Sequence, residues 1–102
     1  MRAVKSSRGT TMHLQQNIDL IAGTEGAGPW RAFGDFFQAT VQVVGTGASI
    51  QLEASNDPLE ITNIADWGEP LTEGIHKIEC GPRWIRVADQ SGADSAILNG
   101  RG

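Results

Sequence analysis

Few side chains in this 102-residue chain could carry out catalysis. Nucleophilic catalysis needs a nucleophile beside a general base, and the candidates are Cys80, His13 and His76. In an extended strand His76 and Cys80 lie about 13 Å apart, too far for proton transfer. Cys80 also falls on the apolar face of its segment, where a thiol stays protonated. We therefore expect Cys80 to be a core residue and the protein not to be an enzyme.

Metal and phosphate sites are also poorly matched by the sequence. Two histidines and one cysteine lack the clustered spacing of a zinc site. The glycines around Thr46 join two expected strands rather than opening a helix, so they do not form a phosphate loop. An acidic run could hold calcium in a loop or form a solvated edge, and the second interpretation is favoured. Its members are Asp57, Glu60, Asp66, Glu69 and Glu73. We predict no cofactor and no metal.

The aromatic residues allow three interpretations. They are Trp30, Phe33, Phe36, Phe37, Trp67 and Trp84, with no tyrosine. The rings could plug one end of the fold. Alternatively, Trp30, Phe33 and Trp84 could lie at an interface with another chain, because aromatic residues are enriched in interface cores. A sugar-stacking platform is the third interpretation.

Charge is distributed unevenly along the chain. Arg2, Lys5 and Arg8 lie among the first eight residues, which contain no acid. The remaining 94 residues hold five basic and twelve acidic side chains, a net charge of −7. Such a body would repel a phosphate backbone, so we predict no nucleic-acid partner. We expect residues 1–10 to be a flexible basic arm, either solvated or docked on an acidic surface of a neighbour.

The sequence also bounds the cellular setting. No apolar run approaches the roughly 20 residues that a membrane helix needs, so we expect no membrane partner. The first residues lack the apolar segment of a secretory signal. The single cysteine, Cys80, excludes an internal disulfide. These features favour synthesis in a reducing cytoplasm.

Apolar and polar residues alternate with a period of two along most of the chain, which predicts strands. The clearest run is 37–54, in which Phe37 to Val43 alternate before Gly45, and Ile50 to Ala54 alternate after it. We predict a β-hairpin there, with a turn of Ser, Asn, Asp and Pro at its end. Further strands are expected over 12–22, 59–64, 75–80, 83–89 and 95–99. Between residues 30 and 37 we expect at most one helical turn.

The fold class follows from these strands. Six or seven short strands, with turn signals every eight to twelve residues or so, predict an all-β protein. We expect an antiparallel β-sandwich of jelly-roll or immunoglobulin-like type, with a small barrel as the alternative. Residues 11–102 should form one domain after the arm, and the 13 glycines fit its many turns.

Two stretches resemble small β-sandwich virion structural proteins of tailed bacteriophages. The first has the pattern V-x-V-x-G-x-x-x-x-I-x-L-x-x-S-N-D, from Val41 to Asp57, and leads to a loop tryptophan, here Trp67. The second is P-R-W-I-R-V, from Pro82 to Val87, followed by a glycine-containing turn and a final short strand. The resemblance extends from residue 37 to residue 98 and leaves the arm outside it.

This resemblance implies a multi-copy structural protein of the virion. We expect a capsid decoration (cement) protein that binds the assembled shell and stabilises it, with the major capsid protein as partner. It should also bind itself as a homo-oligomer, with a trimer as one candidate. The alternative is a tail, neck or fibre accessory module that binds a host-surface carbohydrate or receptor. In either case the protein would belong to the virion after synthesis in the host bacterial cytoplasm. The expected assembly residues are Arg2, Lys5, Arg8, Trp30, Phe33 and Trp84.

Overall fold

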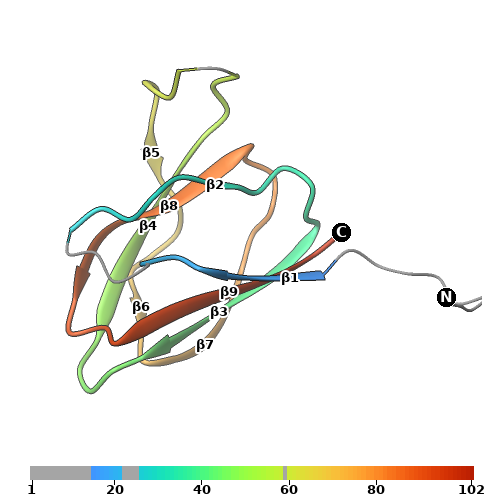
Figure 1. The fold of residues 1–102 in the computed structure, drawn as a ribbon. Helices are drawn as coiled ribbons and strands as arrows, with labels where there is room; N and C mark the ends of the chain where they lie inside the picture. The colour runs from blue at the N-terminus through green and yellow to red at the C-terminus, as the bar shows by residue number, and fades with distance from the viewer. Residues whose placement is uncertain (1–14, 22–25, 59) are drawn as a thin grey trace, which may run out of the picture.

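The computed structural model describes residues 15–21, 26–58 and 60–102, which form two antiparallel sheets (Figure 1). Sheet A has the order β1-β9-β3-β7, and sheet B the order β2-β8-β4-β5, with β6 also paired to β4. The strands of sheet A are β1 (Gln15–Asp19), β3 (Gln38–Val44), β7 (Gly74–Ile78) and β9 (Ser95–Arg101). Those of sheet B are β2 (Arg31–Ala32), β4 (Ser49–Ser55), β5 (Ala65–Asp66), β6 (Leu71–Thr72) and β8 (Trp84–Ser91).

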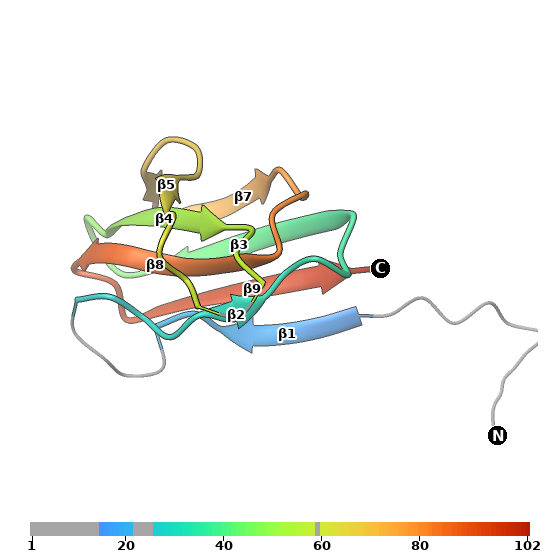
Figure 2. The ribbon, with the colours of Figure 1, turned by 90° about the horizontal axis from the view of Figure 1, so that it is seen from above.

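The two sheets pack face to face, so the predicted antiparallel β-sandwich is confirmed (Figure 2). Both sheets turn one apolar face inward, and these faces meet in the core. The inward residues of the long strands are Ala39, Val41, Val43, Ile50, Leu52, Ala54, Ile85, Val87, Ala96 and Leu98. Burial of this apolar surface drives the packing of the two sheets. None of the described residues is in a helix, and so none lies in a helix able to cross a membrane.

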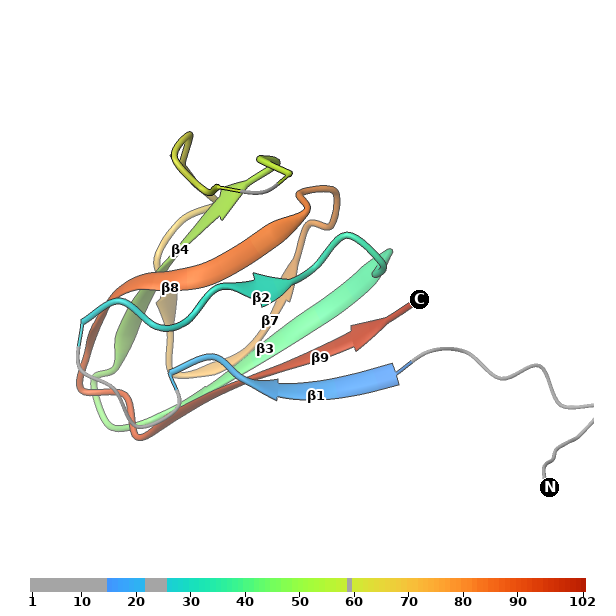
Figure 3. The ribbon, with the colours of Figure 1, turned by 45° about the horizontal axis from the view of Figure 1, so that its top comes forward.

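The segment 37–54 contains the two predicted strands, but they do not form a hairpin. β3 pairs with β9 and β7 in sheet A, whereas β4 pairs with β8, β5 and β6 in sheet B. The connection through Gly45 is therefore an arch that carries the chain from one sheet to the other (Figure 3). The hairpin prediction was wrong because alternation indicates which face of a strand is buried but does not determine which strand it pairs with.

A second arch returns the chain from β8 to β9, and it lies against the first at the same end of the sandwich (Figure 3). The backbone N–H of Asp94 donates to the carbonyl of Val44 over 2.7 Å. Gly45 has a φ of 143°, and a Cβ atom there would collide with the carbonyl oxygen of Gly92. Only glycine therefore fits at this crossing point.

Residues 30–37, for which at most one helical turn was expected, need one correction, the orientation of Phe37. The segment 30–37 has no helical turn: it holds β2 and a tight turn in which the N–H of Phe36 donates to the carbonyl of Phe33. The apparent helical spacing reflects a turn that directs both rings inward, where they meet edge to face at 6.1 Å. Phe36 lies on the backbone of Gly100, while Phe37, expected on the apolar face, is 67% exposed.

The remaining differences concern strand bounds and direction. The strand expected over 59–64 is absent from the described residues 60–64, and β5 follows it instead. The strand expected over 12–22 is described as β1, and residues 12–14 and 22 lie outside the described part. Within β7, Ile75 faces outward, with 69% of its surface exposed.

Substitution of Gly45 tests the contact between the arches. Gly45→Ala should lower the free energy of unfolding by about 2–4 kcal/mol, because the methyl group meets backbone atoms that cannot move aside. Gly47→Ala is the matched control: its φ is also positive, at 70°, but no atom lies within 4 Å of the added carbon. That variant should lose only about 1 kcal/mol in urea unfolding. Equal losses for the two variants would contradict the proposed close contact.

Candidate functional site

Cys80 and His76, two of the candidates for nucleophilic catalysis, both make contacts that support the fold. Cys80 is half-buried against the core, and burial raises the pKa of its thiol. His76 lies at the corner between β6 and β7, where its Nε2 is 2.6 Å from the carbonyl oxygen of Thr72. A bond from the ring to this carbonyl ties the two strands together at the point where the chain changes sheet.

Within the acidic run, Asp57 bonds to the loop that precedes β5. Its Oδ2 atom accepts hydrogen bonds from the backbone N–H groups of Thr62 and Asn63, both over 2.7 Å. These bonds, the one from Asn63 foremost, lower the pKa of Asp57 from 3.8 to about 2. The carboxylate therefore closes the loop before β5. Within the described residues no group of three or more His, Cys, Asp or Glu side chains is arranged to hold a metal.

The two sequence patterns that carry the phage resemblance meet in space. The backbone N–H of Arg83 donates to Oδ1 of Asn56 over 2.8 Å, and Nε1 of Trp84 donates to the carbonyl of Asp57 over 2.8 Å. Trp84 is also the register partner of Ser55 in the β4–β8 pair. The S-N-D and P-R-W patterns thus form one clasp that fixes the end of sheet B.

The loop tryptophan Trp67 forms a similar tie. Its Nε1 donates to the carbonyl of Glu79 over 2.7 Å, which links the β5 loop of sheet B to the end of β7 in sheet A. Its ring packs partly against the core. Trp67 and Trp84 therefore use their indole N–H groups for hydrogen bonds within the chain.

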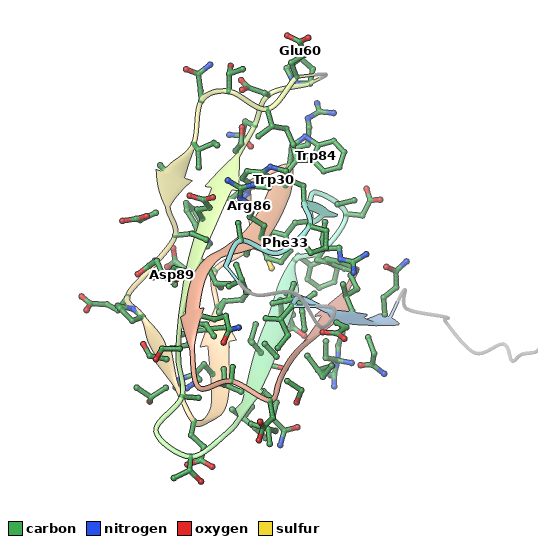
Figure 4. All side chains as sticks on the ribbon, turned by 60° about the vertical axis from the view of Figure 1, so that its left-hand side comes forward. Trp30, Phe33, Glu60, Trp84, Arg86 and Asp89 are labelled. Atoms are coloured by element: carbon green, nitrogen blue, oxygen red, sulfur yellow. The ribbon has the colours of Figure 1, made fainter. Side chains whose placement is uncertain are left out.

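The Trp30 ring contacts Arg86, which also forms an ion pair with Glu53. The guanidinium carbon of Arg86 lies 4.4 Å from the centre of the Trp30 ring, a cation–π arrangement, and its Nε donates to Oε1 of Glu53 (Figure 4). The N–H of Gly28 also donates to the carbonyl of Val87 over 2.8 Å. Together these contacts hold the segment before β2 alongside β8 and place the Trp30 ring over the outer face of sheet B.

The predicted assembly residues separate into three groups. Phe33 is completely buried in the core of its own chain, so its assignment to an intermolecular contact was wrong. Trp30 and Trp84 are half-buried on sheet B and hold loops in place. Arg2, Lys5 and Arg8 lie outside the described residues. Of the three described residues, the structure therefore leaves only Trp30 and Trp84 at the surface, both on sheet B.

The outer face of sheet A is a surface that sequence reasoning did not identify. One row across the four strands, given by the register, reads Asp19, Ile97, Gln42 and Ile75. The next row reads Asn17, Asn99, Thr40 and Lys77, and Asn99 donates to Asn17 over 2.8 Å. Val44, at the end of β3, is 43% exposed. Ile75 and Ile78 are three positions apart, so in a strand their side chains lie on opposite faces. This spacing could have indicated from the sequence that Ile75 points away from the core.

The two outer faces differ in charge. Asp19, Lys77 and Arg101 are the charged side chains at outward positions of the described strands of sheet A, and neutral amides lie between them. On sheet B, Glu53, Asp66 and Asp89 face outward, and Arg86 forms an ion pair with Glu53. The acidic character of the chain is thus concentrated on sheet B and its loops, and the outer face of sheet A is weakly charged.

The Asp57 loop makes a testable contribution to pH dependence. Because the folded-state pKa is lowered to about 2, the stabilisation is present above pH 4 and is lost as the pH falls toward 2. Asp57→Asn should be less stable than the wild type in urea unfolding at pH 7, and the difference should shrink between pH 4 and pH 2. A difference that stays constant over this interval would contradict the role of the carboxylate.

Comparison with known proteins does not assign a family: no protein-family model, no curated protein and no solved structure matches the chain.

Proposed function

We propose that this protein is a non-enzymatic structural component of a tailed-phage virion, and that it decorates and stabilises the capsid. The observation that carries the proposal is the outer face of sheet A. It combines exposed aliphatic side chains with neutral amides, whereas the opposite face is acidic. The phage assignment itself comes from the two sequence patterns that meet at the clasp of Asn56 and Trp84.

The composition of this face is that of a protein contact. Cores of protein interfaces are depleted of charged residues, and burial of exposed aliphatic groups favours association. Ile75 lies beside Gln42, which in turn lies beside Ile97, so two isoleucines flank one amide in a single row. Amides such as Gln42 can bond to a partner at a lower desolvation cost than ions.

The rest of the surface supports the same role. A net negative body limits non-specific association and keeps a multi-copy protein soluble before assembly. The loops on sheet B are tied by Asp57, Trp84 and the Arg86 pair, which restricts the conformations open to them. Rigid surfaces lose little conformational entropy on binding.

Stabilisation of a shell follows from mass action. A subunit that binds the assembled shell, and not the free capsid protein, shifts the equilibrium toward the shell. Multiple copies add their contributions across the particle, so even modest affinity per copy is sufficient. Catalysis is not required for this function, and the half-buried Cys80 is consistent with that.

Substitution of Ile75 tests the role of the face. Ile75→Glu should leave the free energy of unfolding within about 0.5 kcal/mol of the wild type, because the side chain is 69% exposed. Its occupancy on virions, measured in particles grown from a phage lacking the gene and supplied with the variant, should fall about tenfold or more, since a carboxylate would be buried in the contact.

Ile64→Glu provides the matched control. Ile64 is also exposed, at 39%, but lies in the loop before β5 on the side of sheet B. Its occupancy should equal that of the wild type. Equal occupancy of the Ile75 and Ile64 variants would exclude the outer face of sheet A as the binding surface, and absence of the wild-type chain from virions would overturn the proposed function.

A further inference from the structure

A groove runs between the edge of sheet A and the loop that follows β5. It encloses about 480 Å³, and its lining residues are Asp66, Trp67, Gly68, Glu69, Leu71, Lys77, Ile78 and Glu79. A second depression of about 670 Å³ lies on the other side of the same stretch of chain, since Lys77, Ile78 and Glu79 line both. Phe37, which is 67% exposed, lines the second. The groove, and not this depression, borders the free edge of β7, because the depression is lined from the β3 side by Gln38 and Ala39.

The wall of this groove is an unpaired strand edge. Within the described residues β7 pairs with β3 alone, so every second N–H and C=O of β7 points away from the sheet. Such an edge can accept another strand through main-chain hydrogen bonds. Trp67 covers only the end of the edge, where its Nε1 bonds to the carbonyl of Glu79.

The charge of the groove selects a basic partner. Asp66, Glu69 and Glu79 are exposed along its rim, and Lys77 is the one cation among the lining residues. The sequence from residue 57 to residue 76 contains no lysine or arginine. The floor is apolar, with Trp67 and Ile78 half-buried. The matching ligand is therefore an extended segment with several cations and small apolar side chains.

The chain itself contains such a segment. Residues 1–14 carry Arg2, Lys5 and Arg8, and the first acid of the sequence is Asp19. These 14 residues could span up to about 46 Å when extended, which exceeds the length of the groove wall. We propose that the groove receives residues 1–14 of a second copy of this chain, added as a strand along β7.

The topology favours a second copy over the chain's own segment. β1 lies at the opposite edge of sheet A from β7. The chain's own residues 1–14 would therefore have to cross about 19 Å of sheet to reach the free edge of β7. β1 begins at the end of the sheet toward which β7 runs, because Gln15 pairs with Arg101 and Ile78 with Ala39. The chain's own segment would therefore join β7 in parallel. A neighbouring copy can join antiparallel, which is the more stable arrangement.

A charge exchange in the full-length chain tests this docking. The groove variant carries Glu69→Lys and Glu79→Lys, and the arm variant carries Lys5→Glu and Arg8→Glu. Each should weaken self-association, measured by sedimentation velocity at 0.15 M salt, about tenfold or more relative to the wild type, because attraction becomes repulsion. A chain with all four changes should associate like the wild type, and so should an equimolar mixture of the two variants.

Two exposed acids outside the groove provide the control for the charge exchange. Asp35→Lys with Asp89→Lys changes the same charge at two exposed acids that do not line the groove, and should associate like the wild type. A wild-type chain that stays monomeric, a groove variant that associates normally, or a mixture that fails to associate would overturn the proposal. The neighbouring copy is supplied by a multi-copy particle, so the inference rests on the proposed function in that respect. Absence of the chain from virions with self-association intact would overturn only the function.

Discussion

Two crossings of the chain between the sheets touch at the backbones of Gly45 and Gly92. Each arch connects a long strand of one sheet to a long strand of the other, β3 to β4 and β8 to β9. Their contact sets the separation and alignment of the sheets at this end, and the bond from Asp94 to Val44 holds it. With one cysteine in the chain and no helix in the described residues, the core between these four strands provides most of the stability.

The opposite end is fixed by side chains instead of glycines. Asn56 and Asp57 accept bonds from the segment of Arg83 and Trp84, and Trp67 links the β5 loop to the end of β7. Polar and aromatic residues whose types suggested a binding site therefore hold loops in place in the structure. They also leave two surfaces free for interaction, the weakly charged outer face of sheet A and the acidic groove beside β7.

Sequence alternation predicted the fold class and most buried positions. Val41 and Leu52 lie on the apolar side of the predicted alternation over 37–54, and both are buried. The pairing of β3 with β9, rather than with β4, could not be predicted, because a short glycine connection can close either a hairpin or an arch. The choice is made by contacts between distant segments, here the arches at Gly45 and Gly92.

The interaction surfaces were harder to predict than the core. Aromatic residues were predicted to lie at an interface because they are enriched there, yet Phe33 is completely buried and Trp84 supports a loop. Ile75 was overlooked because a single apolar residue at an edge strand carries little periodic signal. The acidic run was expected to form a solvated edge, and Glu60, Asp66, Glu69 and Glu73 are exposed. Its place beside the open edge of β7 depends on a sheet order that the sequence does not reveal.

The central claim is that this sandwich functions as a particle-bound structural protein, and a cryo-electron microscopy reconstruction of the virion tests it most directly. We expect sandwich-shaped density repeated over the capsid surface, with β3, β7 and β9 turned toward the shell. Density restricted to the tail or a single vertex would support the tail-module alternative instead. Virions that lack the chain, or copies bound to the shell through sheet B, would contradict the account.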